Sequence, residues 1–150
     1  MKNLKTSQVV LSYKNEIKKE DRVKITMSEN AYRLLIEDAF GENTIEHHVS
    51  VKAILLNVRL EVLGIVDVAE GGISDSPIDI RVILQAALLS NASSIILARN
   101  SPSGSIVPGV EDKSTSNRFR EACKILGFSY NDFLIITSEQ YYSFADEGLI

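Results

Sequence analysis

The sequence predicts an α/β domain in which a mixed β-sheet carries helices on both faces. Segments with helical spacing alternate with short apolar runs along the chain, as in layered α/β architectures. Two of those runs, residues 49–57 and 61–68, are joined by a short connection that predicts a β-hairpin. The first run begins as strict alternation and becomes fully apolar, which is typical of a strand covered on both faces.

Three segments repeat apolar residues at the spacing of an amphipathic helix. Ser28 can cap the first, Pro77 stands near the start of the second, and Asp112 or Ser114 can cap the third. Gly41-Glu42-Asn43 is expected to end the first helix. The helices are expected over residues 31–40, 77–90 and 112–126.

Further strands or extended segments are predicted before and after these helices. Residues 8–13 and 23–25 flank a charged loop, and residues 70–72 read as a turn or bulge. Core strands are expected at residues 94–98 and 133–137. The final cluster of aromatic residues favours closure of the core, although such clusters also stack on nucleobases in single-strand binders. It consists of Tyr141, Tyr142 and Phe144.

Composition narrows the class of protein. The 150 residues fit one domain, 1–150, in which residues 1–24 form an N-terminal extension, and the net charge of −4 argues against broad electrostatic capture of nucleic acid. No apolar window resembles a secretory signal or a membrane span, so a cytoplasmic protein that does not bind membranes is expected. The single cysteine, Cys123, excludes an intrachain disulfide and is expected to be buried in a helix.

The stretch IILARNSPSG, residues 95–104, ends an apolar strand in a polar turn, where enzymes often carry working residues. Ser101 and Ser103 flank Pro102, but no histidine matches into this loop, so turn formation is favoured over a serine nucleophile. The histidines His47 and His48 are adjacent. On an extended strand they would point to opposite faces and could not bind one metal ion together.

Several segments, in order and at matching separations, resemble the RadC-type domain of the JAMM (also called MPN) metalloprotease fold. The matching segments are ILLNVRLEVLGI, GGISDSPIDIRVILQAAL, NASSIILARNSPSG, PGVED, LIIT and YYSFADEGLI. The resemblance covers residues 24–150, is closest to the Bacteroidetes branch, and implies a mixed sheet with cytidine-deaminase-like layering. The family carries a historical DNA-repair label, which is a name and not an observation.

The resemblance implies zinc chemistry at defined positions. The family holds zinc with two histidines and an aspartate, leaves one position for water, and uses a glutamate as proton acceptor and a serine near the oxyanion. The histidine positions carry Arg99 and Ser101 here, the serine position carries Gly109, and the glutamate position falls on Val49. Only Asp112 is retained as a ligand. The rest of the loop is kept, namely Asn100, Pro102, Ser103, Gly104 and Pro108, whereas the family's Asp-His pair appears as Asn131-Asp132.

These departures predict a protein that holds no zinc or other cofactor and is not an enzyme. A guanidinium cannot be deprotonated and would repel a metal ion, so we expect Arg99 to pair with Asp112 within about 6 Å. The expected role is an interaction module for an unidentified protein, a second copy of the chain, or DNA through the basic residues of the N-terminal segment. The alternative is an active zinc hydrolase that cuts peptide or isopeptide bonds.

Overall fold

A five-stranded mixed sheet forms the centre of the computed structural model, which describes residues 5–41, 44–71 and 78–150. The strand order is β2-β1-β3-β4-β5. Only β3 and β4 run parallel, and the other neighbours are antiparallel. The mixed sheet and the hairpin predicted from sequence are therefore confirmed. The strands are β1 (Ser50–Leu56), β2 (Val62–Glu70), β3 (Ser94–Asn100), β4 (Ser129–Ile136) and β5 (Tyr141–Ser143).

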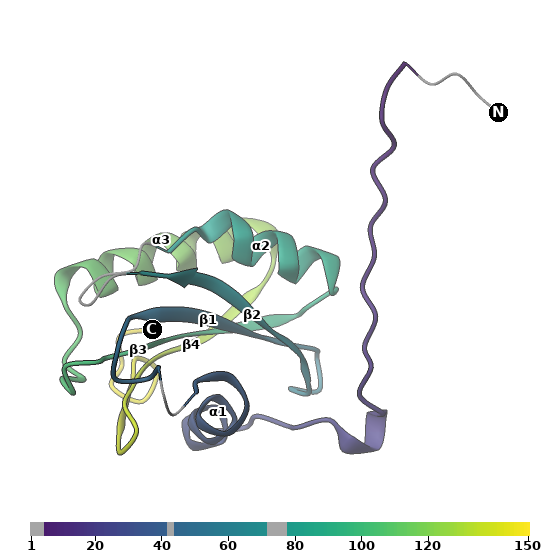
Figure 1. Ribbon diagram of the computed structural model, residues 1–150. Helices are drawn as coiled ribbons and strands as arrows, with labels where there is room; N and C mark the ends of the chain where they lie inside the picture. Colours follow the sequence, from purple (N-terminus) through teal and green to yellow (C-terminus); the bar gives the residue numbers. More distant parts are fainter. Residues whose placement is uncertain (1–4, 42–43, 72–77) are drawn as a thin grey trace.

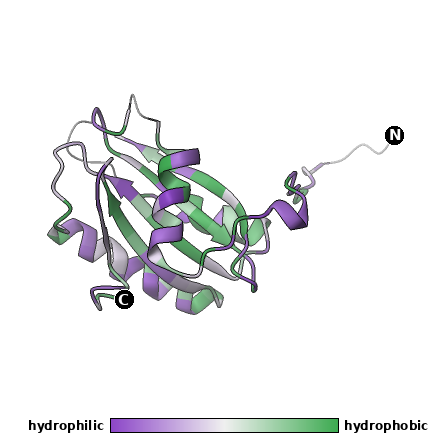
Figure 2. Cartoon of the chain, turned by 90° about the horizontal axis from the view of Figure 1, so that it is seen from below, coloured by the Kyte–Doolittle hydropathy of each residue, from purple (hydrophilic) through white to green (hydrophobic). Residues whose placement is uncertain are grey.

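Helices cover both faces of the sheet (Figure 1). The helix α1 (Ser28–Leu34) continues as a π-helical segment, η2 (Leu35–Ala39), on one face, and α2 (Ile80–Leu89) and α3 (Val110–Leu126) lie on the other. Strand residues alternate between two apolar cores, because successive side chains point to opposite faces. In β1, Ile54 and Leu56 join the core under α1, whereas Ala53 and Leu55 join the core under α2 and α3. Figure 2 shows these apolar strands behind the more polar α1.

The helix starts differ from those expected. The residue before α1 is Met27, and Ser28 is already helical; the side chain of Asn30 accepts hydrogen bonds from the backbone N–H groups of Thr26 and Met27. The side-chain amide of Asn30, the third residue of the helix, thus accepts from the backbone N–H groups that precede α1. The prediction that Ser28 caps this helix was therefore wrong.

No cap had been predicted for α2, and the caps predicted for α3 were wrong. In α2 the side chain of Asp79 accepts from the backbone N–H of Arg81 at 3.0 Å. In α3, Gly109 occupies the cap position, and Asp112 lies inside the first turn. The expectations on residues 42–43, 72 and 77 lie outside the described residues.

The predicted N-terminal strands behave differently from each other. Residues 23–25 pair with the beginning of β2, through an isolated bridge between Lys24 and Glu61. Residues 8–13 pair with no strand among the described residues, and they belong to an arm that extends away from the body of the protein (Figures 1 and 2).

Two further expectations are confirmed by burial. Cys123 is 1% exposed, and burial raises the pKa of its thiol to about 11, as expected for an inert core residue. Tyr141 stacks on Tyr32, and Phe144 stacks on Phe133, so the terminal aromatic residues close the core. Over the described residues, no helix is long and apolar enough to span a bilayer.

Candidate functional site

The C-terminal end of β3 carries two polar residues to opposite faces of the sheet. Arg99 follows Ile95 and Leu97, which belong to the core under α3, whereas Asn100 follows Ile96 and Ala98, which belong to the core under α1. Alternation along the strand therefore sends the Arg99 side chain towards α3 and the Asn100 side chain towards α1.

Arg99 and Asp112 form a two-point ion pair. Arg99 Nε donates to Asp112 Oδ1 at 2.6 Å, and a terminal guanidinium nitrogen donates to Asp112 Oδ2 at 2.8 Å. The side chains are only 19% and 14% exposed. Asp112 is positioned by the start of α3, since its Oδ2 also accepts from the backbone N–H of Gly109 at 2.8 Å. The predicted pair is confirmed, and it has the bidentate geometry that makes arginine–carboxylate contacts strong.

Asn100 is fully buried and holds together two distant segments. Its Oδ1 accepts from the backbone N–H of Ser50 at 2.7 Å, and its Nδ2 donates to the carbonyl oxygens of Ile45 and His48 at 2.8 and 2.9 Å. Three backbone groups that precede or begin β1 thus depend on one side chain. Asn100 was expected only as part of the retained loop, and no spacing in the sequence indicates these contacts.

His47 lies in a turn and His48 directly follows it, so the two histidines are not on an extended strand as expected. Residues 44–47 form the turn, in which the backbone N–H of His47 donates to the carbonyl of Thr44 at 3.1 Å. The turn directs the carbonyl groups of Ile45 and His48 towards Asn100, which accounts for the difference. The argument from strand alternation therefore does not apply to these residues.

The remaining predicted site residues lie around the end of β3. Ser101 is 8% exposed, and its hydroxyl lies 3.3 Å from that of Ser103. Val49 is buried just before β1, whose Val51 pairs with Arg99 in the sheet. Gly104 adopts a φ of 87°, a conformation that suits glycine in the turn after Pro102.

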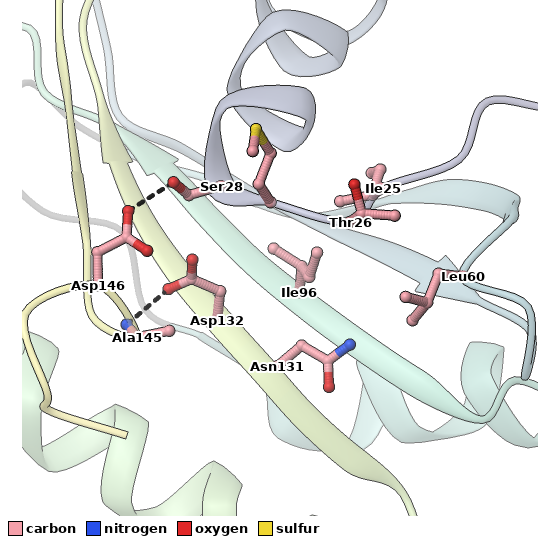
Figure 3. Close-up of a pocket in the computed structure, with 10 residues that line it drawn as sticks. Ile25, Thr26, Ser28, Leu60, Ile96, Asn131, Asp132, Ala145 and Asp146 are labelled. Atoms are coloured by element: carbon pink, nitrogen blue, oxygen red, sulfur yellow. Dashed lines mark hydrogen bonds between the residues drawn. The ribbon is translucent and has the colours of Figure 1, made fainter.

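The Asn131-Asp132 pair lies on the other face of the sheet, in the wall of a cavity of about 250 Å³ (Figure 3). The cavity opens between the start of α1 and the chain after β5. Ser28 faces Asp146 across it and donates a hydrogen bond of 2.5 Å to the carboxylate. Sequence reasoning placed no site here. The lining residues are Ile25, Thr26, Met27, Ser28, Leu60, Ile96, Asn131, Asp132, Ala145 and Asp146.

Asp132 is a buried carboxyl group. None of the ten described residues that line this cavity is basic, so none of them offers Asp132 a cation. It accepts from the Ser143 hydroxyl at 2.6 Å and from the backbone N–H groups of Phe133 and Ala145 at 2.7 and 3.0 Å. Burial raises the pKa of Asp132, and these hydrogen bonds lower it in part. The Asp132 carboxyl group thus connects β4 to β5 and to the residues that follow β5.

Comparison with known proteins identifies the family. The model of the RadC-like JAB domain family matches residues 25–149. The chain belongs to the RadC-like JAB domain family. The match covers both the β3 end and the Asn131-Asp132 pair.

Relatives of this RadC-like JAB domain occur in distant bacteria, each under the name UPF0758 protein. One from Porphyromonas gingivalis is 38% identical over 130 residues, which is 86% of this chain and 56% of that protein. One from Flavobacterium johnsoniae is 33% identical and covers 84% of this chain and 53% of its own length. One from Thermotoga maritima is 34% identical over 125 residues. The chain spans about half the length of the curated relatives it matches.

The side chains at the β3 end do not fit the zinc ion that the resemblance implies. A zinc site would need deprotonated nitrogen or oxygen ligands at these positions, but they present the Arg99 cation and the Ser101 hydroxyl. Both oxygens of Asp112 already accept hydrogen bonds from Arg99 or Gly109. Among the described residues, no three His, Cys, Asp or Glu side chains come together as a metal-binding group.

Proposed function

We propose that this RadC-like JAB domain is non-catalytic and acts as a binding module for a protein partner. The Arg99–Asp112 ion pair is the observation that carries the proposal. It places a permanent positive charge against the one carboxylate that the resemblance would give to zinc.

Two features of the pair make it a stable replacement for a metal centre. The guanidinium supplies the positive charge that a partly buried carboxylate needs, and it does so through two hydrogen bonds. A zinc ion would have to displace Arg99 and leave that cation near its own charge. Coulomb repulsion at such short range is unfavourable at any protein dielectric.

A protein partner is favoured over DNA by surface composition. The chain carries 20 acidic and 16 basic residues, so its overall field does not attract polyanions. Large apolar side chains are exposed near the N-terminus, among them Val9, Val10 and Leu11. Exposed apolar side chains of this kind are typical of surfaces that bind proteins, whereas DNA phosphates are bound by basic and polar groups.

The test is zinc content, compared with a variant that restores the family's ligands. The full chain is purified without added metal and its zinc is measured by mass spectrometry, beside an Arg99→His/Ser101→His variant. We expect the variant to hold about one zinc per chain, because two imidazoles join Asp112, and the natural chain to hold almost none. Stoichiometric zinc in the natural chain would overturn the non-catalytic assignment.

An Arg99→Gln/Ser101→Gln variant provides the matched control, because it removes the same cation without adding imidazoles. Zinc binding by this control would show that Arg99 alone excludes the metal. For the partner class, fluorescence anisotropy with duplex DNA separates the two possibilities. Tight binding that weakens steeply with salt would favour DNA and overturn the protein-partner proposal.

A further inference from the structure

The outer edge of β2 is open over most of its length. β2 is at one end of the strand order, so β1 pairs with only one of its two edges. On the other edge, the backbone N–H of Ile25 donates to the Leu60 carbonyl at 2.9 Å, and that of Val62 donates to the Val23 carbonyl at 2.8 Å. Beyond this start, no strand of the described chain covers residues 64–70. An uncovered strand edge is a template for pairing with another strand.

The N-terminal arm has a sequence that favours a strand, but it pairs with no strand of the described chain. Residues 8–13 alternate, with Val9, Leu11 and Tyr13 on one face, and the sequence predicts a strand or extended segment there. In the structure they make no sheet pairing. Val9, Val10 and Leu11 are 85%, 76% and 79% exposed, and both views show the arm directed away from the body (Figures 1 and 2).

The arm and the open edge suit each other in position, length and charge. The Tyr13 hydroxyl donates to the carbonyl of Leu63, the residue just before the open stretch. Residues 8–13 match residues 64–70 in length to within one residue. Exposed Lys5 and Lys14 flank the arm segment, whereas β2 exposes Glu70 and also Asp67, which pairs with Lys52 of β1. Opposite charges on neighbouring strands favour pairing.

We propose that residues 8–13 of one copy of this chain add as an extra strand to residues 64–70 of a second copy, in a reciprocal exchange. The inference rests on the proposed binding function and names its partner. A two-fold exchange covers both open edges and buries both arms at once, because each copy supplies one arm and one edge. Apart from the Tyr13 contact with Leu63, the arm extends away from the body of its own chain, which favours pairing between chains over pairing within one chain.

The first test measures the mass of the full chain by analytical ultracentrifugation over a broad dilution series. The natural chain is expected to be a dimer at high concentration. Val10→Pro is expected to raise the dimer dissociation constant about ten-fold or more, since proline removes a ladder hydrogen bond and interrupts the strand. A monomer at every concentration would overturn the exchange.

Val110→Pro is the matched control. Val110 is also a strongly exposed valine, at 86%, but it is the first residue of α3, a position that accepts proline. The control is expected to dimerise like the natural chain. Equal loss of dimer in both variants would overturn the role of the arm.

Hydrogen exchange locates the contact. The amides of residues 8–13 and 64–70 are expected to become protected together as concentration rises, and to lose protection together in Val10→Pro. Protection that persists in a monomer would show pairing within one chain and overturn the proposal. The zinc measurement is independent of these outcomes: a zinc-free monomer contradicts only the exchange, and a zinc-loaded dimer contradicts only the non-catalytic role.

Discussion

Two aspartates of this domain are removed from solvent in different ways. Asp112, on the α3 face, is neutralised by the guanidinium of Arg99 and touches one backbone N–H. Asp132, on the α1 face, is more deeply buried, and its partners among the described residues are the Ser143 hydroxyl and two backbone N–H groups. One carboxylate is thus stabilised by charge, and the other by hydrogen bonds alone.

The difference shows what each position can do. The bidentate ion pair and the Gly109 N–H together engage both oxygens of Asp112, so its charge is already compensated and it is a poor ligand for a metal ion. Burial without a cation raises the pKa of Asp132, so its protonation couples to folding. Four substitutions test this comparison, from the largest expected effect on stability to the smallest.

The largest effect is expected from Asn100→Ala, which removes the side chain that holds the end of β3 beside Arg99. The backbone N–H of Ser50 and the carbonyls of Ile45 and His48 lose their partner. We expect a loss of about 3 kcal/mol in the free energy of unfolding, measured in urea, because buried groups are left unsatisfied. The exposed Asn117→Ala is the control, with a change within about 0.5 kcal/mol. A small effect at Asn100 would mean that water or rearrangement replaces these bonds.

Arg99→Met is expected to lower the free energy of unfolding by about 2 kcal/mol, because it leaves Asp112 partly buried without its cation. A double-mutant cycle with Asp112→Asn measures the coupling in the same urea assay. The two losses should be clearly less than additive. Additive losses would show that the pair contributes no interaction energy and would remove the basis of the comparison.

Asp132→Asn is expected to change the pH dependence of stability. The folded-state pKa of Asp132 is raised above the ordinary value of 3.8, so the folded state binds a proton more tightly than the unfolded state. This group therefore makes the natural chain less stable as pH rises from 3.8 through the raised folded pKa.

The Asp132→Asn variant should lack this pH dependence. Its free energy of unfolding, measured relative to that of the natural chain, should therefore increase across that pH range and then level off. Urea unfolding at several pH values provides the measurement. Glu121→Gln, which changes an exposed carboxylate of α3 outside this cavity, is the control for a general charge effect. Parallel pH profiles for Asp132→Asn and the natural chain would contradict the role of burial.

The smallest effect is expected from Gly109→Ser, which restores the residue type that the family carries. A Cβ at Gly109 would lie 3.5 Å from Asp112 Oδ2, an ordinary contact, and the backbone is extended there. Serine is a somewhat better helix cap than glycine, so stability should change by only a few tenths of a kcal/mol. A loss above about 1 kcal/mol would show that the ion pair requires glycine at this position.

Much of the fold could be predicted because its causes are local. Alternating and continuous apolar runs predicted β1 to β4, and helical spacing predicted three helices, although the caps were wrong at Ser28 and in α3. The position of a cap depends on which of several nearby polar side chains hydrogen-bonds to the free backbone N–H groups. Here these side chains are Asn30 and Asp79. The Arg99–Asp112 pair was predictable because a guanidinium and a carboxylate stood at positions that the family brings together.

The amino-acid sequence by itself determined the layered α/β architecture, the family, and the cation opposite Asp112, because periodicity and side-chain chemistry are properties of the chain. Only the tertiary structure decided that Asn100 supports the turn before β1. It also decided that, within the part of the chain it describes, Asp132 is buried without a cation and residues 8–13 have no strand beside them. These outcomes depend on contacts between segments far apart in sequence, where packing selects among many possible partners.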